Sequence, residues 1–189
     1  AVRRAAGMFD VSHMTVIDFS GAGAQGFLRR LLANDVARLK LPGKALYSCM
    51  LTPEGGVVDD LIVYFRGPGS YRMVVNAGTT EKDIAWIRSQ APAEGVAIAP
   101  RRDLAMIAVQ GPKARELALP LLPAELADAA GALKPFFAAE ADGWFVEDVH
   151  HAGECPTDLP GKTDPLRLAT GERRQRSAER QVIEAHVDE

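Results

Sequence analysis

Along most of the chain, hydrophobic and polar residues follow short periodic patterns separated by turns rich in glycine and proline. Alternation with a period of two indicates strands, and apolar residues three and four apart indicate helices. The sequence therefore predicts strands over residues 11–19, 46–51, 57–65, 71–76, 96–99 and 104–109. It predicts helices over residues 23–32 and 80–91, with Thr80 and Asp83 as a capping box, and another helix after Gly111-Pro112. Hairpins mixed with helices imply an α+β fold, an antiparallel or mixed sheet with helices packed on it.

The character of the chain changes near residue 146. Residues 147–189 hold few large apolar side chains, three prolines and the charged stretch Glu172-Arg173-Arg174-Gln175-Arg176. A segment of this composition buries little surface, so we expect a poorly ordered tail with a short helix over residues 177–186. The predicted organisation is one domain over residues 1–146 followed by a divergent tail over residues 147–189.

Composition and charge narrow the functional classes. The chain has 189 residues, of which 47% are hydrophobic and 25% charged, as in an ordinary globular protein. A net charge of −3 gives no electrostatic reason to expect nucleic acid or an anionic membrane as a partner. Two cysteines cannot form a disulfide framework, so we expect a reducing, cytoplasmic setting. No cluster has metal-ligand spacing, so we expect no metal.

Two adjacent carboxylates, Asp59 and Asp60, lie inside the apolar stretch 57–65. Successive side chains of a strand point to opposite faces, so one of the two faces inward. Asp60 shares its face with Tyr64, and the following strand places Val74 and Asn76 together on one face. One hairpin can therefore build a pocket wall from these four residues. On residue types alone, the better supported alternative is that one Asp bonds backbone amides of the preceding turn.

A glycine-rich turn offers a competing interpretation. Gly21, Gly23 and Gly26 follow a strand and open a helix, as in a dinucleotide-binding fingerprint. That fingerprint also requires an acidic residue about 20 positions later, and residues 40–49 contain none. The glycines are better explained as a tight strand-to-helix turn. His13 is likewise better explained as a hydrogen-bonded structural residue than as a base or ligand.

Seven blocks of the sequence form a recognisable series: residues 6–14 (AGMFDVSHM), 32–36 (LANDV), 43–48 (GKALYS), 55–64 (GGVVDDLIVY), 74–77 (VVNA), 81–83 (EKD) and 109–112 (VQGP). In residues, order and spacing these blocks resemble glycine cleavage system T proteins, a family of aminomethyltransferases. The resemblance covers about residues 2–146. It implies the front part of a folate-binding domain, with tetrahydrofolate as co-substrate.

The resemblance also implies functional residues and a reaction. The second Asp of the family's pair, here Asp60, is the catalytic acid, and the positions that match folate-contacting residues are Met14, Tyr47, Asp60, Tyr64, Val74 and Asn76. The family transfers a methylene from an aminomethyl group on the lipoyl arm of H protein to tetrahydrofolate, with release of ammonia. The alternatives are a non-catalytic folate-binding remnant and the folate domain of a dimethylglycine- or sarcosine-oxidising relative.

The chain departs from the family after Val146. There the family continues with a block similar to Arg-Thr-Gly-Tyr-Thr-Gly-Glu, which supplies a tyrosine and a glutamate to the folate site. Residues 147–154 (EDVHHAGE) do not match that block. We therefore expect an incomplete form of the enzyme, weakly active or inactive by itself.

Overall fold

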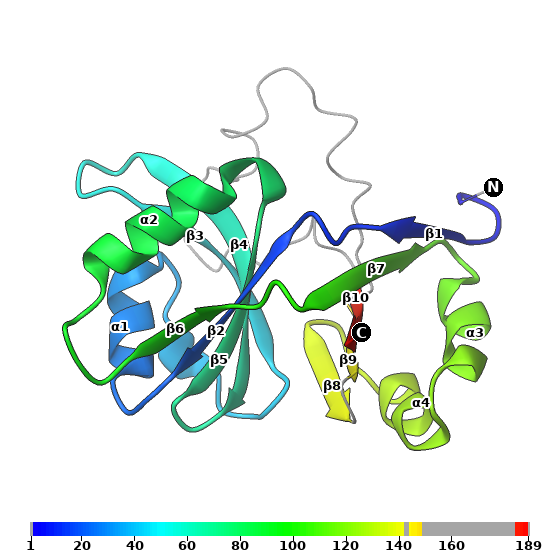
Figure 1. Cartoon of the computed structure of the whole chain (residues 1–189). Coiled ribbons are helices and arrows are strands. Elements are labelled where there is room, and N and C mark those ends of the chain that lie inside the picture. The colour runs from blue at the N-terminus through cyan, green and yellow to red at the C-terminus, as the bar shows by residue number, and fades with distance from the viewer. Residues whose placement is uncertain (1, 142–143, 149–183, 189) are drawn as a thin grey trace, which may run out of the picture.

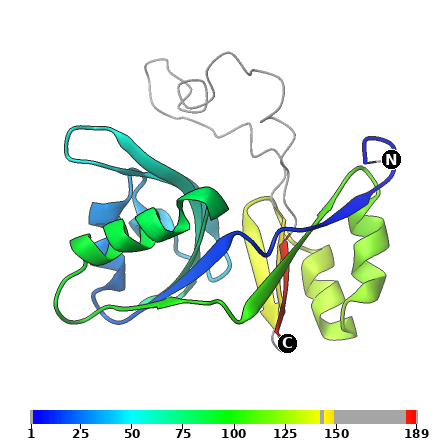
Figure 2. The same cartoon turned by 45° about the horizontal axis from the view of Figure 1, so that its top comes forward.

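The computed structural model describes residues 2–141, 144–148 and 184–188, which form two five-stranded sheets and four α-helices (Figure 1). The strand order is β3-β4-β5-β2-β6 in one sheet and β1-β7-β10-β9-β8 in the other. The two sheets lie side by side, and the helix pairs α1–α2 and α3–α4 lie at opposite ends of the molecule (Figures 1 and 2). The predicted α+β class with antiparallel strands is confirmed.

The sheet with the order β3-β4-β5-β2-β6 carries the residues with candidate chemistry; we call it the helix-covered sheet, because two helices pack over one of its faces. Its strands are β3 (Ala45–Leu51), β4 (Val57–Gly67), β5 (Ser70–Val75), β2 (Thr15–Ser20) and β6 (Ala97–Pro100). All neighbours pair antiparallel, and Ile62 lies opposite both Tyr47 on β3 and Val74 on β5. This register brings one end of β3, β4 and β5 together around Asp60.

The second sheet is formed by chain segments that are far apart in sequence. Its strands are β1 (Gly7–Asp10), β7 (Leu104–Gln110), β10 (Glu184–Asp188), β9 (Trp144–Asp148) and β8 (Phe137–Ala141). Lys44 forms a bridge with Phe137, and Gly43 O accepts a hydrogen bond from Ala138 N at 2.9 Å. The segment before β3 therefore joins the two sheets through backbone hydrogen bonds.

Helices α1 (Ala24–Leu31) and α2 (Thr80–Gln90) cover one face of the helix-covered sheet. Their apolar sides bury Phe27, Leu28, Ile84 and Ile87 against alternate residues of β2, β4 and β5. Helices α3 (Ala114–Ala118) and α4 (Ala124–Gly131) pack at the end of the second sheet, where Leu126 contacts Val146. Among the described helices, none is long and apolar enough to cross a membrane.

A separate core lies between the two sheets. It is formed by Val16, Ala45, Tyr64, Val74, Met106, Ala138 and Phe145, with Met14 packed against it. The Tyr64 and Phe145 rings are nearly perpendicular, with a centroid distance of 5.0 Å. The opposite face of β4 and β5, which carries Leu61, Val63 and Met73, belongs to the core under the helices. Both faces of the central hairpin are therefore buried.

Three predictions of local structure were wrong. The strand predicted over 11–19 begins only at Thr15, because Met14 N donates to Val11 O in a tight turn that leaves exposed His13 between β1 and β2. Asp83 does not cap α2; Thr79 is the N-cap residue, and no side chain makes a cap bond. Within the predicted helix of the tail, residues 184–186 begin the strand β10.

For the rest of the tail, residues 149–183 lie outside the described residues, and with them the remainder of the predicted short helix. Strand β9 runs through the predicted boundary at residue 146 and ends at Asp148.

Candidate functional site

Asp60 is half-buried at the end of the central hairpin, where two neighbouring strands supply its partners. Tyr47 on β3 donates its hydroxyl to Asp60 Oδ2. Asn76, which follows β5, donates its side-chain amide to Asp60 Oδ1 at 3.1 Å and to the Asp60 carbonyl at 3.0 Å. The two carboxylate oxygens are thus held by different donors, which fixes the plane of the carboxylate. Three of the six predicted site residues are in direct contact here.

Asp59 faces the opposite side of β4, as the alternation of a strand requires. Its carboxylate accepts hydrogen bonds from Thr79 Oγ1 at 2.8 Å, Asn76 Nδ2 at 3.1 Å and Asn76 N at 3.3 Å. Only 8% of Asp59 is exposed. The alternative that one Asp bonds backbone amides of the preceding turn is wrong, because the donors to the two carboxylates are Tyr47, Asn76 and Thr79. In that turn Gly56 N donates to Thr52 Oγ1.

Asn76 connects the two carboxylates. Its Nδ2 atom lies within 3.1 Å of Asp59 Oδ1, Asp60 Oδ1 and Asp60 O, which is more acceptors than its two hydrogens can satisfy separately. The Asn76 carbonyl in turn accepts from the hydroxyls of Thr79 and Thr80 at 3.1 and 3.2 Å. The start of α2 therefore holds the amide that orients Asp60.

The other predicted site residues lie in the core between the sheets. Tyr64 and Val74 are 0% and 3% exposed, and Met14 packs against the same cluster. As predicted, they share the faces that also carry Asp60 and Asn76, but their side chains form the packed layer beside the carboxylate. Direct contact between folate and these three residues stays a prediction.

Asp83 on α2 joins Asp59, Asp60 and Asn76 in this polar network. The sequence pattern instead predicts a helix-capping role for Asp83. Its side chain is completely buried, and among the described residues neither carboxylate oxygen has a hydrogen-bond donor. Burial, together with the hydrogen bond and negative charge of Asp59, raises the pKa of Asp83 to about 7. Burial opposes ionisation of Asp59 as well, but bonds from Asp83, Thr79 and Asn76 outweigh it and lower its pKa.

The pKa of Asp83 is raised while that of Asp59 is lowered, as expected for two neighbouring carboxyl groups that hold one proton between them. A protonated Asp83 supplies an O–H that Asp59 can accept, so the Asp83 carboxyl is the donor of this pair and needs none itself. The resulting chain of contacts runs from Asp83 through Asp59 and Asn76 to Asp60.

Replacing Asp83 with Asn is expected to stabilise the protein at neutral and higher pH. A raised folded-state pKa means that the native state holds an extra proton between about pH 4 and 7, so wild-type stability falls as pH rises through that window. The shift corresponds to about 4 kcal/mol, and burial of the new amide offsets about 1 kcal/mol of it. Urea unfolding at several pH values should show a gain of about 3 kcal/mol above pH 7 that disappears near pH 4. An equal gain at both pH values would contradict the assigned titration.

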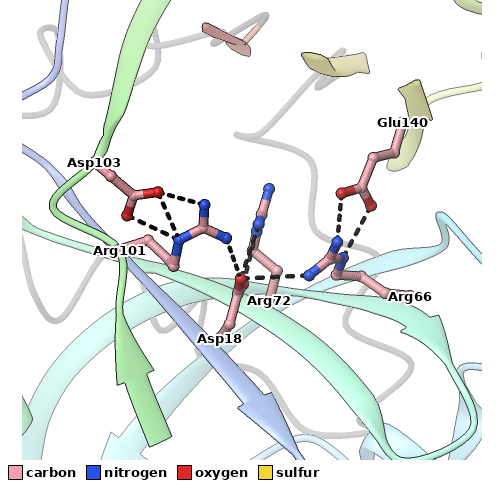
Figure 3. Close-up of polar contacts among 6 residues, drawn as sticks. All are labelled: Asp18, Arg66, Arg72, Arg101, Asp103 and Glu140. Atoms are coloured by element: carbon pink, nitrogen blue, oxygen red, sulfur yellow. Dashed lines mark hydrogen bonds and ion pairs between the residues drawn. The ribbon is translucent and has the colours of Figure 1, made fainter. Parts of the chain in front are cut away.

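A second polar cluster lies on the face of the same sheet that meets the second sheet, around Asp18 of β2 (Figure 3). Arg72 of β5 donates Nε and Nη2 to the two oxygens of Asp18 at 2.8 and 2.9 Å. Arg66 and Arg101 also bond Asp18 Oδ2, at 3.3 and 3.1 Å. Burial works against ionisation of Asp18, but the three guanidinium groups outweigh it and lower its pKa.

The cluster links the two sheets. Arg66 reaches Glu140 of β8, and Arg101 reaches Asp103 just before β7 (Figure 3). The three cations are matched by three carboxylates, so the cluster leaves no excess charge for a ligand. Its role is structural, and strand register rather than any sequence motif brings its members together.

The glycine-rich turn also has a structural explanation. Gly21 N donates to Gly69 O at 3.0 Å and Gly23 N to Gly95 O at 3.0 Å, so these amides already have acceptors. A Cβ atom on Gly21 would lie 2.3 Å from Gly95 O. The residues permit close packing of three loops, as expected from the absence of the acidic partner. A cavity of about 650 Å³ beside this turn, lined in part by Tyr71 and Gln25, shares no residue with the Asp60 network.

Sequence reasoning missed Thr79 and Asp83 as members of the site. The helical period contained a signal for Asp83, because it lies four positions before Ile87 and next to Ile84 on the buried side of α2. That period places a carboxylate on an apolar face, which is expensive unless it is protonated or bonded. No comparable signal existed for Thr79.

The fold and this network define a class of protein: an α+β domain of two antiparallel sheets with a half-buried acid clamped by a tyrosine and an asparagine. The comparison with protein-family models identifies the class, since residues 1–143 match the GCVT N-terminal domain. The chain belongs to this family, the N-terminal domain of glycine cleavage T proteins.

Individual relatives agree with this assignment. The chain is 59% identical over 157 residues to an aminomethyltransferase of Bordetella bronchiseptica, covering 82% of this chain and 43% of the relative. It is 60% identical over 153 residues to an aminomethyltransferase of Chromobacterium violaceum, covering 81% and 42%. The crystal structure of glycine cleavage system aminomethyltransferase T from Bartonella henselae matches with a TM-score of 0.72 and 27% identity, over 99% of this chain and 43% of that one. The chain thus spans less than half the length of these relatives.

Proposed function

We propose that this chain is the folate-binding front portion of an aminomethyltransferase of the glycine cleavage system. The observation that carries the proposal is the geometry at Asp60, a half-buried carboxylate whose two oxygens are held by Tyr47 and Asn76. A carboxylate held in this way has a fixed direction in which it can accept a proton. The family membership supplies the substrate class, tetrahydrofolate.

In the proposed reaction, an aminomethyl group arrives on the sulfur of a lipoyl arm carried by H protein. The methylene forms bonds to both reacting nitrogens of tetrahydrofolate while its bonds to sulfur and to the amino nitrogen break. The products are 5,10-methylenetetrahydrofolate, ammonia and the dihydrolipoyl carrier, and the two N–H protons of the folate pass to the released amine and thiolate. No metal takes part.

Asp60 would accept a hydrogen bond from the N10 side of the folate and assist removal of that proton. Tyr47 would present an aromatic surface with a polar tip to the pterin, and Asn76 would hold the acid in position. Much of the rate would come from holding the two reactants together. Since the chain spans about two fifths of its relatives, we expect weak folate binding and little or no turnover by the chain alone.

The proposal can be tested by titrating the purified chain with tetrahydrofolate and, separately, with NAD, using calorimetry. Binding of the reduced folate, even in the millimolar range, with no binding of NAD is the expected result. The matched control is Asp128→Ala, which removes an exposed carboxylate on α4 and should leave binding unchanged. Binding of NAD without folate would overturn the proposal.

A further inference from the structure

Asp83 has no place in the proposed chemistry, yet it is one of the most deeply buried polar groups among the described residues. It lies on α2, on the side of β4 opposite to Asp60, so it cannot touch a ligand bound at Asp60. An ionisable side chain with no exposure and no ordinary donor is costly to keep. Such a group usually has a role in its surroundings.

The contacts indicate what that role is. Asp83 interacts with Asp59, Asp59 accepts from both nitrogens of Asn76, and Asn76 Nδ2 holds Asp60 Oδ1 at 3.1 Å. Thr79 Oγ1 completes the arrangement by donating to Asp59 at 2.8 Å. A change at Asp83 therefore reaches Asp60 through a single shared amide.

We propose that Asp83 is a positioning residue for Asp60, and that the proton it shares with Asp59 keeps Asn76 in the orientation that aligns the Asp60 carboxylate. This inference rests on the proposed function for its consequence, folate binding, but the arrangement of Asn76 is a property of the protein alone. With the proton in place, Asp59 carries one negative charge that is satisfied by Asp83, Thr79 and Asn76. When the proton is lost, two buried like charges face each other, and Asp59 moves away from Asp83 and disturbs Asn76.

The charged groups that act on Asp83 are few. Asp59 from β4 raises its pKa and Lys82 from its own helix lowers it, while the Lys82 ammonium also donates to the Val58 carbonyl. Asp60 lies on the other face of β4. The pKa of about 7 makes loss of the shared proton an event of the neutral range.

The test is reduced-folate affinity measured between about pH 6 and 8.5 for the wild type, Asp83→Asn and Asp83→Ala. If only the protonated form is competent, wild-type affinity falls about 10- to 30-fold across this range. Asp83→Asn keeps a donor toward Asp59 and should retain at high pH the affinity that wild type has at low pH. Asp83→Ala removes the donor and should bind weakly at every pH. Asp128→Asn, the same chemical change at an exposed position, should follow the wild-type profile.

A second readout does not depend on folate. The side-chain amide resonances of Asn76, followed by NMR, should shift with a midpoint near pH 7 in the wild type and stay constant in Asp83→Asn. Identical pH profiles of folate affinity for wild type and Asp83→Asn would overturn the positioning role. So would Asn76 amide resonances whose pH dependence is the same in wild type and in Asp83→Asn. If the wild type binds no folate at any pH while the Asn76 resonances titrate as expected, the proposed function fails and the positioning role stands.

Discussion

Replacing Asp60 with Ala is expected to weaken binding of tetrahydrofolate by about 10- to 100-fold, the loss that follows removal of a hydrogen bond to a charged group. The fold should survive, because Asp60 is only half-buried and water can satisfy Tyr47 and Asn76 after the change. Calorimetric titration measures the affinity, and urea unfolding should show a change of no more than about 1 kcal/mol.

Asp60→Asn separates the two roles assigned to the carboxylate. The amide oxygen can still accept a hydrogen bond, so folate binding should be largely retained, but an amide cannot accept a proton at neutral pH. At the matching position of the full-length aminomethyltransferase of Bordetella bronchiseptica, the same substitution should reduce turnover by at least about 100-fold with a smaller effect on KM. Near-normal turnover of that variant would contradict a role for Asp60 in proton transfer. Unchanged affinity of Asp60→Ala for tetrahydrofolate would contradict a role for Asp60 in folate binding.

The second large effect is expected from Asp18→Ala, which should lower the free energy of unfolding by about 3 to 5 kcal/mol. The Arg72 side chain is only 4% exposed and lies over the Phe145 ring at 5.1 Å, so it cannot turn to water when its carboxylate partner is lost. Arg66 and Arg101 would lose a shared anion at the same time. Urea unfolding at neutral pH measures the change.

Two matched variants show whether burial is the cause. Asp103→Ala removes a carboxylate of the same cluster whose side chain is 58% exposed, and it should cost less than about 1 kcal/mol. Combining Asp18→Ala with Arg72→Met removes the orphaned charge and should recover much of the loss, since buried ion pairs can often be replaced by apolar side chains. If Asp18→Ala costs no more than Asp103→Ala, the cluster does not stabilise the contact between the sheets.

The secondary structure of the first 110 residues could largely be predicted from the sequence because its periodicity is strong there. The central hairpin of β4 and β5 and both helices packed on it lie close to their predicted positions. The later start of the first predicted strand, at Thr15 instead of Val11, could not be predicted, since Val11 is apolar in either case and only its bond to Met106 O shows that it lies outside β2. The existence of two sheets depends on pairing between segments distant in the chain, and local hydrophobic periodicity does not indicate which segments pair.

For the site, strand alternation determined that Asp59 and Asp60 face opposite sides, and family resemblance selected Asp60. Neither could show what each carboxylate bonds. The partners of Asp60 come from β3 and from the end of β5, and those of Asp59 from the residues before α2. Antiparallel register and the packing of α2 bring these groups together.

By itself, the sequence determined the class of fold, the family and the acid expected to act, because these depend on local periodicity and on blocks of residues in a fixed order. Only the tertiary structure decided that Asn76 joins the two carboxylates, that Asp83 is buried against Asp59 and that three arginines converge on Asp18. The physical reason is that hydrogen bonds, burial and charge interactions depend on distances in space. Residues 16 to 83 positions apart in the chain become neighbours only when the sheets and helices have packed.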